Sequence, residues 1–300
     1  MSNPLPDFPS VEFAPMDGGL TKIIASTPLG RVSILDQGAQ ILEWTPRDSP
    51  SVLYLSPDSP PRPGKSPRGG IPICWPWFGA ALPPLPQTAP AHGFARNQLW
   101  RLREISYPAS RTLSLRFELP AAAQPDYWPT PVRLSLSIQI RESLEVELLT
   151  HNEAGMAITI TEALHTYFRV GDVRKTTVEG LQGTRFIDKL QDGTPAQQDG
   201  SVTIDREIDR IYLNTPHTLR INDPLLGRRI LIEKSGSHST VVWNPWIEKG
   251  LALGDLGTEG YLQMLCVESG NMDPAGIEIA PGDTHRLWVR YSHEPLLRGN

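Results

Sequence analysis

Hydrophobic and polar residues alternate along most of this chain of 300 residues, which is the pattern of half-buried β-strands. The clearest run covers residues 132–140, where Val132, Leu134, Leu136, Ile138 and Ile140 occupy every second position. Similar runs cover residues 21–26, 31–35, 112–119, 144–149, 157–170, 229–234, 240–243, 261–268 and 285–292. No segment longer than about 12 residues repeats with the helical period, so we expect helices only as short connectors. The pattern predicts an all-β fold, a large antiparallel β-sandwich.

Residues 46–90 interrupt this pattern. A loop of that length inside a compact domain is usually either functional or disordered. Its Trp, Phe and Ile residues argue against disorder, so we expect an ordered loop packed over one face of the sandwich. Residues 1–15 are expected to be a flexible N-terminal segment, and residues 16–295 a single β-sandwich domain.

Composition supports a strand-rich protein. The chain has 30 prolines and 25 glycines, and both residues interrupt helices. Cys74 and Cys266 form no spacing pattern, so neither a disulfide framework nor a thiolate metal site is expected. Residues 1–10 lack the features of a signal peptide, and no apolar run reaches the ~20 residues of a membrane helix. We expect a soluble, cytoplasmic protein that is a monomer.

Charge is distributed unevenly. The chain has a formal net charge of -5, yet residues 59–103 contain no acidic residue. The basic residues of this window are Arg62, Lys65, Arg68, Arg96, Arg101 and Arg103. A positive field beside aromatic rings suits a small anion with an apolar face, for which a sugar phosphate is the obvious candidate. The acidic net charge and the many prolines argue against nucleic-acid binding.

Two residues on predicted strands are candidates for acid–base chemistry. Glu268 closes the apolar run 261–267, where a carboxylate is costly to bury unless it is paired or has a raised pKa, as a general base requires. The alternative is an exposed residue at a strand end. Strand alternation places His165 on one face with Tyr167 and Arg169, opposite an apolar face. That face resembles a binding surface, although a structural histidine fits this strand equally well.

Other candidates carry weaker signals. Gly93 allows a sharp bend at which His92 and Arg96 could face one pocket. Asp209 could simply form an ion pair with the adjacent Arg210, and Asp255 resembles a turn residue. The histidines lack the spacing of a zinc site, and no HExxH, Cys-x-x-Cys, GxSxG, Walker or dinucleotide motif occurs. We therefore expect neither a metal nor a cofactor.

Six segments in register resemble the hexose-6-phosphate mutarotases, the glucose-6-phosphate 1-epimerase branch of the aldose 1-epimerase (galactose mutarotase-like) superfamily. They span roughly residues 65–290. The segments begin with Arg-Gly-Gly-Ile-Pro at 68–72 and His-Gly-Phe-Ala-Arg at 92–96, and continue with residues 163–168, 209–212, 242–246 and 266–268.

The resemblance implies a β-supersandwich and a cofactor-free enzyme that interconverts α and β sugar anomers. It implies that Glu268 is the general base and His165 the general acid. It further implies that His92 assists at the ring oxygen and that Asp209 holds sugar hydroxyls. Arg68 and Arg96 would hold the phosphate. Ring opening needs one proton removed from the C1 hydroxyl and one given to the ring oxygen, so a carboxylate and an imidazole suffice.

Two positions depart from the family pattern. Ala91 stands where some members have glutamine, and Gln87 is the candidate replacement. Residues 254–260 also differ from the expected aspartate-aromatic or aspartate-methionine pattern, which leaves one pocket wall undefined.

Two alternatives to the phosphate mutarotase stay open at the sequence level. One is an aldose 1-epimerase for neutral sugars, against which the basic window argues. The other is a non-catalytic carbohydrate-binding protein, which would not need both Glu268 and His165.

Overall fold

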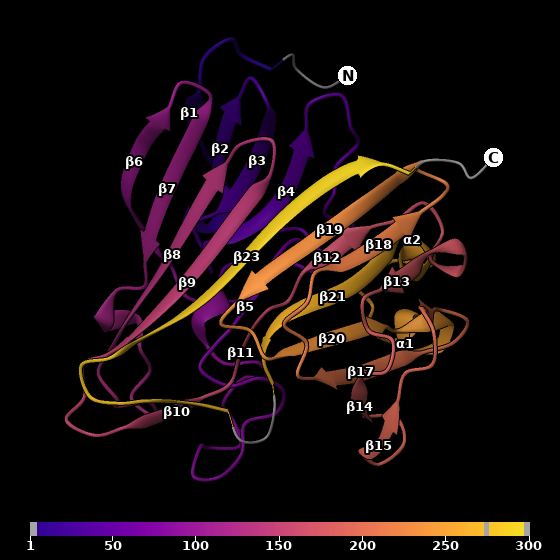
Figure 1. The fold of residues 1–300 in the computed structure, drawn as a ribbon. Coiled ribbons are helices and arrows are strands. Elements are labelled where there is room, and N and C mark those ends of the chain that lie inside the picture. The colour runs from indigo at the N-terminus through magenta and orange to yellow at the C-terminus, as the bar shows by residue number, and fades with distance from the viewer. Residues whose placement is uncertain (1–4, 273–275, 297–300) are drawn as a thin grey trace.

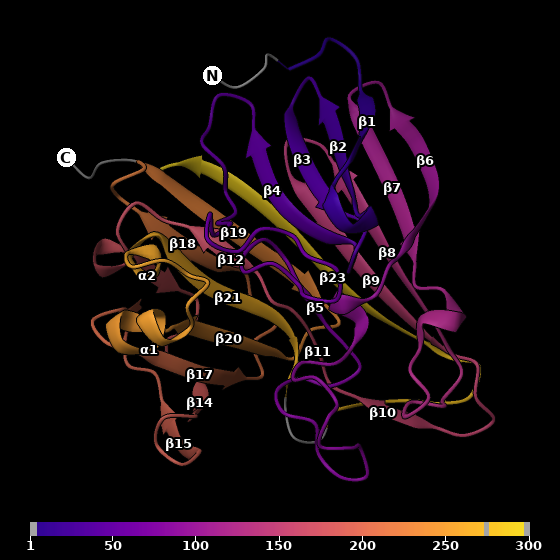
Figure 2. The same ribbon diagram turned by 180° about the vertical axis from the view of Figure 1, so that it is seen from behind.

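The fold is built almost entirely from antiparallel strands that form two facing layers. The structure is a computed structural model that describes residues 5–272 and 276–296. One layer is a nine-stranded sheet, and the other contains a four-stranded and an eight-stranded sheet (Figures 1 and 2). The prediction of an all-β antiparallel sandwich is therefore confirmed.

The nine-stranded sheet has the order β16-β13-β18-β19-β23-β9-β8-β7-β6. Its strands are β6 (Arg101–Ala109), β7 (Thr112–Glu118), β8 (Val132–Ile140), β9 (Leu144–Asn152), β13 (Thr177–Glu179), β16 (Val202–Thr203), β18 (Leu219–Asp223), β19 (Arg228–Ser235) and β23 (Thr284–Pro295). β8 has the bounds that the alternating pattern predicts, and its apolar positions are all buried.

The second layer has two main sheets and a small ribbon. The four-stranded sheet contains β1 (Ser10–Pro15), β2 (Thr21–Thr27), β3 (Gly30–Leu35) and β4 (Gln40–Pro46). The eight-stranded sheet contains β5 (Ile73–Cys74), β11 (Glu162–Leu164), β12 (Tyr167–Arg169), β14 (Arg185–Asp188), β15 (Thr194–Gln197), β17 (Ile208–Leu213), β20 (Ser239–Asn244) and β21 (Met264–Asn271). The ribbon pairs β10 (Ile158–Ile160) with β22 (Ile277–Ile279).

The main hydrophobic core lies between the layers and draws residues from all three large sheets. A second apolar cluster includes Cys74, Tyr167, Trp243 and Cys266. Along the strands of the eight-stranded sheet, residues of this second cluster largely alternate with residues of the main core, so the two sets point to opposite faces of the sheet. This cluster therefore marks the outer face of the eight-stranded sheet.

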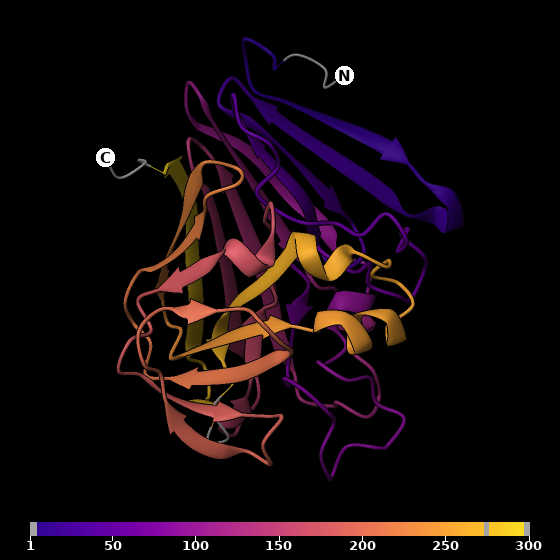
Figure 3. The same cartoon turned by 90° about the vertical axis from the view of Figure 1, so that its right-hand side faces the viewer.

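Helices are short, as the sequence predicts. α1 (Trp246–Ala252) and α2 (Gly260–Gln263) lie on the outer side of the eight-stranded sheet (Figure 3). Single 3-10 turns cover Asp17–Gly19, Ala95–Asn97, Ala121–Ala123 and Val173–Lys175. No helix among residues 5–272 and 276–296 is long and apolar enough to cross a membrane.

Two predicted strands have different bounds in the structure. The run 157–170 is divided into β10, β11 and β12. At Thr161 the chain leaves its partner β22 for β21, and at His165 and Thr166 the pairing with β21 is interrupted before it resumes in β12. The run 261–268 begins as helix α2, and β21 starts only at Met264. In both places pairing partners distant in sequence decide where a strand starts.

The N-terminal segment and the loop 46–90 are both ordered parts of the fold where the structure describes them. β1 pairs with β2 along its whole length, so the expected flexible segment 1–15 overlaps an ordered strand. The loop 46–90 contains only the two-residue strand β5 and isolated bridges, of which Leu53 with Phe168 joins it to β12. Trp75 and Trp77 are buried within it. The expectation of an ordered loop packed against the sandwich is confirmed.

Candidate active site

Strand β21 presents a carboxylate and a thiol on the outer face of the eight-stranded sheet. Leu265 and Val267 belong to the core between the layers, whereas Cys266 belongs to the outer cluster. Because side chains alternate along a strand, Glu268 points to the same side as Cys266. Glu268 is 1% exposed, so the alternative of a solvated strand-end residue is wrong.

His165 lies next to Glu268. It occupies the break between β11 and β12, which both pair with β21, and its backbone N–H donates to the carbonyl of Pro72. The His165 Nε2 atom is 3.4 Å from Glu268 Oε1. The His165 ring stacks on Tyr167, with ring centroids 4.8 Å apart. The predicted base and acid are therefore in direct contact.

The electrostatics of this pair differ from those of an ordinary ion pair. Burial, with the charge of Asp209 as a second cause, raises the pKa of Glu268 well above its ordinary value. Burial and the neighbouring His92 and Arg96 lower the pKa of His165 well below its ordinary value. Both shifts favour the neutral form of each group, a protonated carboxyl beside a neutral imidazole. Glu268 Oε2 and His165 Nδ1 have no hydrogen-bond partner among the described residues.

His92 approaches the pair from the loop after β5. Its ring centroid is 5.7 Å from that of His165 and 4.7 Å from that of Phe78. The Gly79 N–H donates to His92 Nδ1 at 3.3 Å. Burial, Arg96 and Lys189 lower the pKa of His92 to about 3. The neutral ring accepts through Nδ1, so its Nε2 carries the proton and can donate to a ligand.

Gly93 explains how this loop reaches the site. It has φ +74°, and a Cβ at this position would lie 1.9 Å from the carbonyl oxygen of Trp75. Any other residue would push residues 92–96 away from the loop that contains Trp75. The predicted bend therefore exists.

Asp209 lies on β17, which β20 separates from β21, and it does not pair with Arg210. Its Oδ2 is 3.1 Å from Lys189 Nζ, while Arg210 pairs with Asp188 at 3.2 Å. The adjacent residues point to opposite faces of β17, so the local ion pair offered as an alternative is wrong. Asp209 and Lys189 both act electrostatically on Glu268, which places them at the site.

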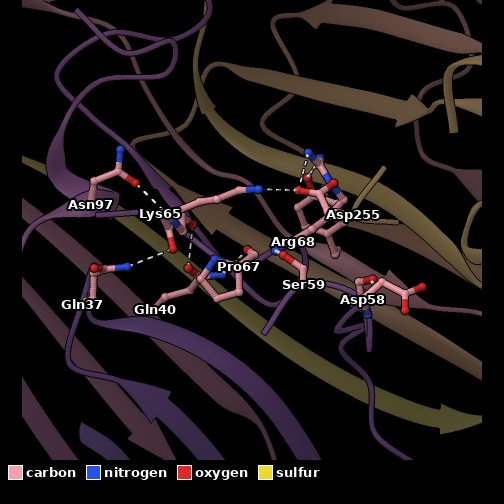
Figure 4. A network of polar contacts seen from close by, with 12 residues as sticks. Gln37, Gln40, Asp58, Ser59, Lys65, Pro67, Arg68, Asn97 and Asp255 are labelled. Carbon is pink, nitrogen blue, oxygen red and sulfur yellow. Dashed lines mark hydrogen bonds and ion pairs between the residues drawn. The ribbon is translucent and has the colours of Figure 1, made fainter. Parts of the chain in front are cut away.

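Arg68 forms the second half of the site together with two residues of other segments. Its Nε donates to Asp255 Oδ1, and its Nη1 donates to the Tyr167 hydroxyl at 3.3 Å. Lys65 Nζ lies 3.4 Å from Asp255 Oδ2 (Figure 4). Asp255 is thus the carboxylate partner of two cations, and describing it as a turn residue is incomplete.

These cations line a pocket of about 180 Å³. Its lining includes Lys65, Arg68, Arg96, Asn97 and Asp255, and Tyr167 closes the end toward His165. A larger pocket of about 380 Å³ contains none of the predicted site residues, so size alone does not locate the site.

Arg96 connects the pocket to the acid–base pair. Its Nη2 donates to the carbonyl of Ala91 at 2.8 Å, while its Nε is buried without a partner among the described residues. Its charge acts on both His165 and Glu268. The backbone of Ala91 therefore holds Arg96 although its side chain offers no polar group, and Gln87 is exposed.

The basic window is not one continuous field. Lys65, Arg68 and Arg96 converge on the pocket, whereas Arg103 pairs with Glu118 in the nine-stranded sheet. Arg62 and Arg101 are exposed and line no part of this pocket. The prediction of a single field from all six residues is wrong, because loop and strand segments of the window face different sides of the molecule.

Sequence reasoning missed three residues of the site. Lys189 follows β14 in an ordinary turn, and only its contact with Asp209 reveals its position. Asp255 lies 187 residues from Arg68, too far for any local pattern. Cys266 has its sulfur within 4.8 Å of donor atoms of His165 and Glu268, whereas the sequence predicted no metal-binding arrangement. Of these, only Cys266 had a sequence signal, since it occupies position i−2 to Glu268 on a strand.

Comparison with known proteins agrees with this geometry. Residues 22–292 match the aldose 1-epimerase family. A protein of Escherichia coli (strain K12), provisionally named a glucose-6-phosphate 1-epimerase, is 38% identical over 252 residues, which are 83% of each chain. A similarly named protein of Cenchrus ciliaris is 30% identical over 302 residues, 96% of this chain and 89% of its own.

A crystal structure of YeaD from Salmonella typhimurium, provisionally named a mutarotase, superposes with a TM-score of 0.88 at 34% identity and covers 97% of both chains. The chain therefore belongs to the aldose 1-epimerase family and is an epimerase.

Proposed function

We propose that this protein interconverts the α and β anomers of hexose 6-phosphates, with Glu268 as the base and His165 as the acid. The observation that supports this proposal best is the position of Tyr167. Its ring stacks on His165 and its hydroxyl accepts a hydrogen bond from Arg68. One side chain thus separates an acid–base pair from a pocket of cations, which matches a sugar that reacts at one end and carries a phosphate at the other.

The reaction needs two proton transfers at neighbouring oxygens. Glu268 takes the proton of the C1 hydroxyl while His165 gives a proton to the ring oxygen, so that the ring opens. The aldehyde rotates, and reversal of the two transfers closes the ring on its other face. Because both oxygens are bonded to the same carbon, two groups 3.4 Å apart can reach both of them. Each such transfer contributes about 10²–10⁴-fold when the pKa of the group lies near the working pH.

The protonation that these pKa shifts favour fits this exchange. A neutral carboxyl beside a neutral imidazole contains as many protons as a carboxylate beside an imidazolium. A sugar that bridges the two groups can therefore move the proton between them without exchange with solvent. The unpartnered Glu268 Oε2 and His165 Nδ1 give the pair further hydrogen-bonding capacity toward a ligand.

The surrounding residues would hold the sugar. The Nε2–H of His92 can donate to the ring oxygen. Asp209, which Lys189 keeps in place, can accept from sugar hydroxyls. Trp243 is 6.1 Å from the His165 ring and offers an apolar face to the sugar carbons.

Arg68, Arg96 and Lys65 would bind the phosphate. Arginine forms forked, charge-assisted hydrogen bonds that match phosphate geometry. The pocket of about 180 Å³ has room for a phosphate group beside these cations. This leaves the sugar ring on the side of Tyr167 and His165.

The test is nuclear magnetic resonance magnetisation exchange between the anomers of glucose 6-phosphate, run beside glucose. We expect acceleration with the phosphate and little with glucose. Arg68→Ala should abolish that preference, whereas the matched control Arg103→Ala, from the same basic window but outside the pocket, should retain it.

Three outcomes would contradict the proposal. Equal acceleration of both sugars before and after Arg68→Ala indicates a neutral-sugar epimerase. Tight binding of glucose 6-phosphate without accelerated exchange indicates a binding protein. Unchanged phosphate preference in Arg68→Ala would show that the pocket does not bind the phosphate.

A cytoplasmic location, a monomeric state and a single domain over residues 16–295 stay predictions of the sequence.

A further inference from the structure

The acid–base pair has a third neighbour that anomer exchange does not use. Cys266 is completely buried and lies two residues before Glu268 on β21. A ring nitrogen of His165, the sulfur of Cys266 and a carboxylate oxygen of Glu268 all lie within 4.8 Å of one another. Nitrogen, thiolate sulfur and carboxylate oxygen are the three ligand types that Zn²⁺ uses in proteins.

We propose that His165, Cys266 and Glu268 form a Zn²⁺ site, and that occupation of this site inhibits the enzyme. The inhibition rests on the catalytic roles proposed above, whereas the binding does not. Three protein ligands would leave the fourth coordination position of Zn²⁺ to water, as in catalytic zinc sites.

The unpartnered atoms provide an independent argument. Glu268 is 1% exposed and its Oε2 has no partner among the described residues. A buried carboxylate oxygen without a hydrogen bond is unfavourable, and a metal ligand bond would satisfy it. The ligand atoms need to move together by about 1 Å to reach zinc bonds of about 2.0–2.3 Å, which rotation about the side-chain bonds can supply.

Charge balance also supports binding. Metal binding displaces the thiol proton of Cys266 and the carboxyl proton of Glu268. A thiolate and a carboxylate then neutralise the Zn²⁺ ion, so the site is neutral both before and after binding. The nearby Arg96 and Lys189 therefore do not meet a new net positive charge. The bound ion would occupy the atoms that exchange protons with the sugar, and anomer exchange would stop.

The experiment measures binding separately from activity. Zn²⁺ is titrated into the full chain by calorimetry in two buffers of different ionisation enthalpy, with the expectation of one site and about two protons released. Co²⁺ is titrated in parallel, and a thiolate-to-cobalt charge-transfer band is expected. Zn²⁺ should also suppress anomer exchange at the same concentrations, and a chelator should restore it.

Cys266→Ser should weaken Zn²⁺ binding by at least about tenfold and abolish the charge-transfer band. The matched control is Cys74→Ser, which changes the other buried free cysteine and should change neither. If Cys266→Ser does not fold, His165→Gln should weaken the same binding without touching the thiol.

Three outcomes would overturn the proposal. They are absence of the charge-transfer band in the unchanged protein, equal Zn²⁺ affinity in Cys266→Ser, or full anomer exchange with the site occupied. If the protein lacks exchange activity but binds Zn²⁺ as described, the proposed function is wrong and the proposed Zn²⁺ site is still supported.

Discussion

Two buried glutamate–histidine contacts lie on opposite faces of the eight-stranded sheet, and their pKa values are shifted in different ways. On the outer face, His165 Nε2 lies 3.4 Å from Glu268 Oε1. On the inner face, His285 Nε2 of β23 lies 2.8 Å from Glu162 Oε1 of β11 and so joins the two layers. Glu162 is completely buried, and Asn271 of β21 also donates to it at 3.1 Å.

The pKa shifts separate the two contacts. Burial acts to lower the pKa of His285, but the hydrogen bond and charge of Glu162 outweigh it and the pKa is raised. No such compensation occurs at His165, whose pKa is lowered. The inner contact therefore favours the protonated form of His285. The outer contact favours neutral His165 and Glu268 and leaves Glu268 Oε2 and His165 Nδ1 without a partner among the described residues. The same two residue types join the two layers in one place and are the proposed proton-transfer groups in the other.

The largest effect is expected for Glu268→Gln. Loss of the base should reduce the enzymatic exchange rate by about 10²–10⁴-fold. The variant should be at least as stable as the unchanged protein at neutral pH, because glutamine resembles the neutral carboxyl that burial favours. Magnetisation exchange measures the loss of activity, and thermal unfolding measures the stability. A variant that keeps its activity would remove Glu268 as the base.

His285→Gln should show the reverse behaviour. It leaves Glu162 buried beside Asn271 alone, which should lower the free energy of unfolding by about 3–5 kcal/mol. Exchange activity of the folded fraction should change little. Chemical denaturation measures the difference, with His151→Gln as control, since His151 contacts Thr284 in the same sheet. A loss below about 1 kcal/mol would mean that the inner pair is not a charged contact.

The inner pair also predicts a pH dependence with a definite sign. The pKa of His285 is raised in the folded state, so its contribution is complete below the unfolded value of about 6.5. The contribution is lost as pH rises through the folded pKa. The unchanged protein should therefore lose stability relative to Glu162→Gln/His285→Gln with increasing pH. Denaturation at several pH values between 6 and 9 tests this. If the free energy of unfolding of the unchanged protein rises relative to that of the double variant as pH increases, the prediction is wrong.

The smallest effect is expected in the cation pocket, where Asp255 competes with a bound phosphate. Asp255→Asn should lower the KM for glucose 6-phosphate by about 2- to 10-fold, because repulsion between two anions disappears. The KM for glucose should not change, and added salt should reduce the effect. A higher KM would show instead that Asp255 orients Arg68.

Local patterns predicted the scaffold well. The alternation over residues 132–140 matches β8 residue for residue, since each apolar position faces the core regardless of its partner strand. The alternation after Thr159 also placed His165 and Tyr167 on one face and Leu164 and Phe168 in the core. It gave no account of Glu162, which shares the core face and depends on His285 across the layers.

The site itself was predicted only in part. Short motifs led to the prediction of six site residues, but not of the contacts between them. These residues are Arg68, His92, Arg96, His165, Asp209 and Glu268. The inclusion of Arg101 and Arg103 in a single basic field was wrong, because charge counted along the chain ignores which side of a strand or loop each residue faces.

The sequence by itself determined the strand-rich sandwich, the family and most of the polar residues at the site, because alternation and motifs are local properties. Only the tertiary structure decided the partners: Asp255 with Arg68, Lys189 with Asp209, and Cys266 beside the acid–base pair. Burial and charge act through space over a few ångströms. The pKa of a side chain, and with it the difference between the inner and the outer glutamate–histidine contact, is therefore set by neighbours that sequence order does not reveal.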